Sequence, residues 1–250
     1  MFVLGLLLPT FWAMDPPGCD RLRSRRRRGP SSDRGTDPRP STRTPMLEVV
    51  DLECRRGDRR LFSDLCFSLP SGTLLHVRGR NGSGKTTLLR ALCGLLAREA
   101  GQICWRGEDI AALGEDYRRE MLYFGHLNGI KSDLNGIENL RVAATLDGDR
   151  IADDALWQAL GRMGLAGYED LPTKVLSQGQ KKRVALARLL VSRAPLWILD
   201  EPFSALDTDA VELLGSLIAG HVAGGGLVVL TTHQEVPLTS GQVQRLQLGA

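Results

Sequence analysis

The chain has 250 residues, of which 42% are hydrophobic and 24% are charged, a composition that is ordinary for one large domain or two small ones. Its net charge of +3 is unevenly distributed, because residues 1–45 hold nine Arg, no Lys and four Asp and carry +5, which leaves −2 for residues 46–250. The basic excess therefore does not indicate nucleic-acid binding, and five cysteines without a C-x-x-C pair argue against a zinc site.

The first 45 residues are predicted to form no part of the folded domain. An apolar stretch at 2–14 precedes the arginines of 21–28, which is the reverse of a secretory signal, and it is too short to span a membrane unaided. Residues 15–45 are rich in Pro, Arg, Ser and Gly and are expected to be disordered. Translation is expected to begin at Met46, with a genuine disordered tail or a short anchor at 2–14 as the alternatives. Later apolar runs are all shorter than a membrane span.

Residues 46–250 are predicted to form an α/β domain. Strands at 47–53 and 65–69, around a charged turn at 55–60, should open a small antiparallel sheet. Further strands are expected at 74–77, 103–105, 122–124, 196–199, 227–231 and 243–248, and helices at 86–96, 136–146, 151–163, 181–191 and 209–222. The alternation of buried strands and helices predicts a mainly parallel sheet covered on both faces, with 136–163 as an inserted helical arm.

A phosphate-loop motif joins the expected strand at 74–77 to the helix that follows it. The pattern G-x-x-x-x-G-K-[ST] is matched by Gly79, Arg80, Asn81, Gly82, Ser83, Gly84, Lys85 and Thr86, and Thr87 completes the predicted nucleotide contacts. In such a loop the backbone N–H groups surround phosphate oxygens, Lys85 neutralises charge and the Thr86 hydroxyl ligates Mg²⁺. The strand, loop and helix N-terminus in this order favour a working phosphate site over a chance match.

An acidic strand end follows much later in the chain, where the strand at 196–199 runs into Asp200 and Glu201. Asp200 is predicted to bind Mg²⁺ and Glu201 to act as the base for the attacking water. Two adjacent carboxylates buried only as a structural pair would be costly unless bound or hydrogen-bonded. Between the two motifs, the segment 176–180 reads Leu-Ser-Gln-Gly-Gln, and its Ser177 lies 92 residues after Lys85 and 23 before Asp200.

This order of motifs resembles the ATP-binding cassettes of ABC transporters over residues 46–250. The resemblance implies a P-loop NTPase fold with an antiparallel β subdomain and a helical signature subdomain. It also implies a head-to-tail homodimer, in which each ATP lies between the phosphate loop of one subunit and the signature of the other. The signature would comprise Ser177, Gln178, Gly179 and Gln180. Ser177 and Gly179, at a helix N-terminus, would bind the γ-phosphate, and Gln178 stands where the family usually has Gly.

Further matches and departures concern the remaining site residues. His233 matches the catalytic switch histidine that senses the γ-phosphate, and residues 204–207 match the loop that links the two sites. The loop that usually offers Gln beside Mg²⁺ has His126 instead, which is either its replacement or an arm contact with no ligand role. The aromatic residue that usually stacks on adenine is absent, and Arg56 is its expected substitute, because a guanidinium stacks on a base.

Finer features resemble the haem-exporter ATPase of bacterial cytochrome c maturation (CcmA type). They are the patterns at 52–62, 125–131, 164–170 and 196–203. The resemblance implies an ATP-hydrolysing translocase subunit, peripheral on the cytoplasmic face of the inner membrane, with integral membrane partners and no haem site of its own. Another small-cassette exporter subunit is the main alternative. A soluble non-transport ABC protein would usually need a tandem cassette or coiled-coil insertion, and a non-hydrolysing regulator would lack Glu201 or His233.

Overall fold

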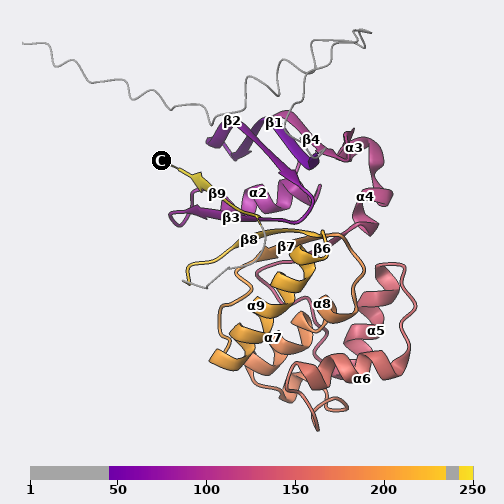
Figure 1. Ribbon diagram of the computed structural model, residues 1–250. Coiled ribbons are helices and arrows are strands. Elements are labelled where there is room, and N and C mark those ends of the chain that lie inside the picture. Colours follow the sequence, from indigo (N-terminus) through magenta and orange to yellow (C-terminus); the bar gives the residue numbers. More distant parts are fainter. Residues whose placement is uncertain (1–44, 235–241, 250) are drawn as a thin grey trace, which may run out of the picture.

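The computed structural model describes residues 45–234 and 242–249, which form two sheets and a helical layer (Figure 1). Of the tail predicted at 1–45, residues 1–44 lie outside the described residues, whereas Pro45 is the first residue of a strand and pairs with Pro70. Among the described helices, none combines the length and apolar character needed to cross a membrane.

The antiparallel sheet has the strand order β2-β1-β4-β5. Its strands are β1 (Pro45–Arg56), β2 (Arg59–Pro70), β4 (Ala100–Trp105) and β5 (Glu108–Asp109). A two-residue turn at Gly57, whose φ is +58°, joins the first two strands, and their register pairs Arg56 with Arg59. The predicted small antiparallel sheet is therefore present, and β4 and β5 extend the predicted pair of strands.

The parallel sheet has the order β6-β7-β8-β3-β9, and all its described pairs are parallel. Its strands are β6 (Met121–Phe124), β7 (Leu196–Asp200), β8 (Leu227–Thr231), β3 (Thr73–Gly79) and β9 (Gln242–Leu248). Every residue of β7 and β8 is buried, as expected for central strands covered on both faces.

The helices divide between the two faces of the parallel sheet. They are α2 (Lys85–Leu92), α3 (Ile110–Leu113), α4 (Glu115–Arg119), α5 (Gly136–Leu146), α6 (Asp153–Arg162), the 3₁₀ turn η1 (Thr173–Val175), α7 (Gln178–Leu186), α8 (Arg188–Val191) and α9 (Thr208–Ala223). Helix α2 lies between the two sheets, and α5 to α9 cover the opposite face (Figure 1). Alternate residues of β7 enter the two cores, with Ile198 on the α2 side and Trp197 on the helical side.

Two predicted helices have different bounds in the structure, and two short helices were not predicted. The helix expected at 86–96 ends at Leu92, because the chain turns at Gly94 with φ +67°. The helix expected at 181–191 begins at Gln178 and divides at Ala187 into α7 and α8. Helices α3 and α4 were not expected, since segments of four and five residues carry no readable period.

Candidate functional site

The phosphate loop turns tightly between β3 and α2. At Gly79, whose φ is +153°, a Cβ would lie 2.5 Å from Ser83 Oγ and 2.6 Å from the Leu248 carbonyl oxygen. Gly84 has φ +99° and directly precedes the first residue of α2. Residues with side chains would be strained at both positions, so the loop geometry explains why the motif needs these glycines.

Lys85 folds back over this loop. Its Nζ donates hydrogen bonds to the carbonyl oxygens of Gly79, at 2.9 Å, and of Arg80, at 3.4 Å. These contacts hold the ammonium group above the loop, where it can exchange carbonyl oxygens for those of a phosphate. The first residues of α2 line the same cavity as the loop, and the N–H groups of a first helical turn have no partner within their own helix.

Asp200 ends β7 as a buried carboxylate that accepts two hydroxyl hydrogen bonds. Thr86 Oγ1 donates to its Oδ2 at 2.8 Å, and Thr231 Oγ1 donates to its Oδ1 at 2.7 Å. The Asp200 side chain is thereby fixed between the phosphate loop and β8. Thr231 was not singled out from the sequence, because nothing in the apolar run of β8 distinguishes this hydroxyl from an ordinary strand threonine.

Glu201 follows in an unusual backbone conformation, with φ +51°. Its N–H donates to Thr231 Oγ1 at 3.0 Å, and its Oε2 accepts the backbone N–H of His233 at 3.2 Å. The other carboxylate oxygen, Oε1, is buried and accepts no hydrogen bond within the described residues, although His233 Nε2 is 3.4 Å away. The carboxylate is therefore held by a hydrogen bond at one oxygen only.

These groups meet in one cavity of about 410 Å³. It is lined by Arg56, Arg59, Leu61, Asn81, Gly82, Gly84, Lys85, Thr86, Thr87, His126, Asp200, Glu201 and His233. Arg59 and Leu61 were not predicted as site residues, and Arg59 is brought into the wall by its pairing with Arg56 in the β1–β2 register. His126 and Arg56 both reach the cavity, and their ligand roles stay predictions.

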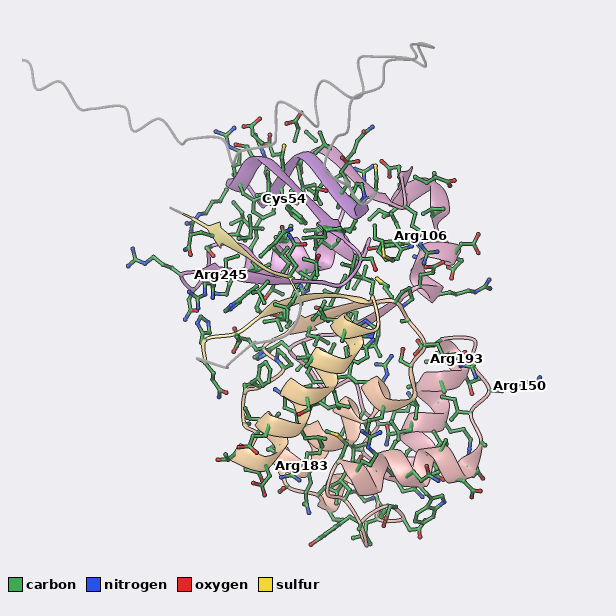
Figure 2. All side chains as sticks on the ribbon, viewed as in Figure 1. Cys54, Arg106, Arg150, Arg183, Arg193 and Arg245 are labelled. Atoms are coloured by element: carbon green, nitrogen blue, oxygen red, sulfur yellow. The ribbon has the colours of Figure 1, made fainter. Side chains whose placement is uncertain are left out.

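The signature segment is absent from the described lining of this cavity. Ser177 caps α7 in a reciprocal arrangement, since its Oγ accepts from the Gln180 backbone at 3.2 Å and Gln180 Oε1 accepts from the Ser177 N–H at 2.9 Å. Figure 2 shows Arg183 of α7 among the helices on one side of the parallel sheet and Cys54 of β1 on the other. The exposed start of α7 is thus free to meet a ligand held elsewhere.

Two side chains of α7 reach the segment after Glu201, and neither was predicted. Arg183 forms an ion pair with Asp207, the N-cap of α9. Lys182 is buried and donates to the Glu201 carbonyl oxygen at 2.8 Å and to Ser204 Oγ at 2.6 Å. Burial lowers the pKa of Lys182 to about 8, although the Glu201 charge opposes this shift.

Known proteins share this arrangement. The family model described as ABC transporter matches residues 62–204. The cytochrome c biogenesis ATP-binding export protein CcmA of Dechloromonas aromatica is 54% identical over 204 residues, which cover 82% of this chain and 100% of the relative. The protein of the same name from Nitrosomonas europaea is 56% identical over 203 residues, covering 81% of this chain and 95% of the relative. A solved structure of the ATP binding subunit of an ABC transporter has a TM-score of 0.72 at 27% identity, covering 82% of this chain and 88% of its own.

Proposed function

This chain belongs to the ABC transporter family and, within it, to the CcmA-type ATP-binding export proteins of cytochrome c biogenesis, and we propose that it hydrolyses ATP to drive haem delivery for c-type cytochrome assembly. The observation that carries this conclusion is identity above 50% to such proteins over nearly their whole length. The complete set of phosphate loop, acidic strand end and switch histidine supports it, because a non-hydrolysing regulator would lack part of that set.

Hydrolysis requires a group that takes a proton from the attacking water. Glu201 suits this task because its carboxylate belongs to the cavity wall, where the His233 backbone N–H holds Oε2 and Oε1 accepts no hydrogen bond within the described residues. A positioned general base contributes about 10²- to 10⁴-fold to a rate. Lys85 and the N-terminus of α2 bind and orient the phosphates. His233 lies beside the Glu201 carboxylate and senses the γ-phosphate.

The residues present fit a Mg²⁺ ion. Thr86 Oγ1 and the Asp200 carboxylate lie 2.8 Å apart at the cavity wall, and both are oxygen donors of the kind Mg²⁺ prefers. No cluster of three or more His, Cys, Asp or Glu suited to a metal occurs within the described residues. Such a sparse donor set agrees with an ion that is held mainly by substrate phosphates and water. When bound, Mg²⁺ would neutralise phosphate charge.

The proposed working unit is larger than one chain. Because Ser177 and Gly179 lie outside the cavity of their own chain, we propose that they bind the γ-phosphate held by a second copy, in a head-to-tail homodimer. Residues 46–250 would form this ATPase domain, peripheral on the cytoplasmic face of the inner membrane and attached to integral membrane subunits. ATP-driven closing of the dimer would then move those subunits.

The decisive experiment is covalent haem staining of c-type cytochromes in a strain whose only copy carries Lys85→Ala. We expect the stained bands to disappear while immunoblots show equal amounts of the protein. A complementing parental gene should restore them. Normal c-type cytochromes together with failed export of another compound would instead assign the chain to a different small-cassette exporter.

A further inference from the structure

Lys182 is a buried cation whose hydrogen-bond partners among the described residues are all neutral, although the Glu201 charge acts on it from nearby. Its side chain is part of a residue only 7% exposed, and the two groups that it donates to, a carbonyl and a hydroxyl, are both neutral. The Phe124 ring lies on another side, with its centroid 5.6 Å from Nζ. Burying an ammonium group with neutral partners costs stability, so the fold alone does not explain its presence.

The contacts of Lys182 converge on the backbone of the proposed catalytic base. The Glu201 carbonyl oxygen accepts from Lys182 Nζ at 2.8 Å, from Ser204 Oγ at 3.0 Å and from the Ser204 N–H at 3.3 Å. These three donors hold Glu201 in a backbone conformation, with φ of +51°, that is strained for every residue except glycine. The direction of the Glu201 side chain depends on that conformation, because φ sets where Cβ points.

Helix α7 connects this contact to the signature segment. Lys182 lies five positions after Ser177, which caps the helix and would meet the nucleotide of a second copy. The same helix therefore carries the exposed signature at its start and the buried Lys182 further along. A shift of α7 moves both groups together, since a helix of this length is rigid.

We propose that Lys182 is a positioning residue for ATP hydrolysis, which ties the signature helix to the Glu201 carbonyl and the Ser204 hydroxyl and so aims the Glu201 carboxylate. This inference rests on the proposed function. It adds a direct link, within one chain, from the signature that contacts one nucleotide to the base that acts on the other. The lowered pKa agrees with it, because the desolvated ammonium is retained despite its cost.

The test compares Lys182→Met with Lys182→Arg in the full chain, copurified with its membrane subunits. Met keeps the length and apolar stem without the charge, and Arg restores a donor. We expect Lys182→Met to lower kcat for ATP about tenfold or more with KM within twofold of the parent, because a hydrogen bond from a charged group is lost at the base and not at the phosphates. Lys182→Arg should recover part of kcat, and the melting temperature of the Met variant should not fall.

Unchanged kcat in Lys182→Met would overturn the inference, as would a raised KM with unchanged kcat, or lost activity that only follows a lowered melting temperature. Ser204→Ala provides an independent check, because it removes the neighbouring donor. If both side chains act on one carbonyl, the double variant should lose less than the product of the two single losses. Multiplying losses would contradict the shared role. A parent complex without ATPase activity would refute the proposed function itself, whereas an active parent with an equally active Met variant refutes only this inference.

Discussion

Thr231 offers a sharp test of how the site is held together, because a matched threonine lies in the adjacent strand. Both Thr231 in β8 and Thr73 in β3 are fully buried. Thr231 Oγ1 donates to Asp200 and accepts from the Glu201 N–H, whereas Thr73 Oγ1 has no hydrogen-bond partner among the described residues. Replacing either threonine by Val keeps the shape of the side chain and removes the hydroxyl. The change should lower the stability of the fold at Thr231, where hydrogen bonds are lost, and should not lower it at Thr73.

The magnitude follows from the partners that each change leaves behind. Thr231→Val leaves the Glu201 N–H without its acceptor, at a cost of about 1–3 kcal/mol, and removes a donor from a buried carboxylate, at a cost of about 1.5–3 kcal/mol. Together this is about 2.5–6 kcal/mol, a large part of the roughly 5–15 kcal/mol that stabilises a typical domain. Thr73→Val removes an unpaired polar atom and should be neutral or slightly stabilising.

Urea denaturation of the nucleotide-free chain measures both values, and Thr231→Ser serves as a control that keeps the hydroxyl. We expect Thr231→Val to shift the midpoint strongly downward, Thr231→Ser to lose about 1 kcal/mol for the missing methyl, and Thr73→Val to stay at the parental midpoint. Equal losses in the two Val variants would refute the reasoning, because the hydrogen bonds of Thr231 would then contribute nothing.

Three other predictions concern the cavity and its neighbour. Glu201→Gln should bind ATP but hydrolyse it at least about 100-fold more slowly, as measured by phosphate release; parental turnover would refute its role as the base. His126→Gln should retain more ATPase activity than His126→Ala, because Gln restores an acceptor in the cavity wall, and equal activities would favour an arm contact without a ligand role. The Lys182 pKa is lowered from 10.5 to about 8, so the unfolded chain binds more protons between these values, and this residue adds stability as pH rises through that window. In thermal melts from pH 7 to 10, the melting temperature of Lys182→Met should therefore exceed that of the parent at pH 7, and this excess should shrink as pH rises. A difference in melting temperature that stays constant with pH would contradict the burial of this charge.

Much of the fold could be predicted because its central strands are continuous apolar runs between turn residues. The residues of β7 and β8 are all buried, and a fully buried strand is recognisable in the sequence as a short continuous apolar run. The phosphate loop and the acidic strand end were equally readable, since phosphate chemistry restricts residue type and spacing. The short helices α3 and α4 could not be read, because neither completes two turns.

The unpredicted site residues share a different cause, which is dependence on contacts far apart in the chain. Thr231 reaches Asp200 across 31 positions and Lys182 reaches Glu201 across 19, so no local motif contains both residues of either pair. Arg59 enters the cavity wall through its pairing with Arg56, which depends on the exact two-residue turn. A motif identifies groups that touch substrate, whereas the groups that hold them in place become visible only in three dimensions.

Asp200 and Glu201 illustrate the effect of these contacts, because two adjacent carboxylates receive different surroundings. Asp200 remains within the strand, and each of its oxygens accepts a threonine hydroxyl, so it is rigid and suited to a cation. Glu201 leaves the strand at a positive φ and lines the cavity, and its Oε1 accepts no hydrogen bond within the described residues. Had both residues continued in strand geometry, their side chains would point to opposite faces of the sheet, and only one could reach the nucleotide. The strained conformation of Glu201 therefore places the proposed base beside the proposed metal ligand. Thr231 accepts a hydrogen bond from the Glu201 N–H and Lys182 donates one to its carbonyl oxygen, and we expect these two contacts to maintain that conformation.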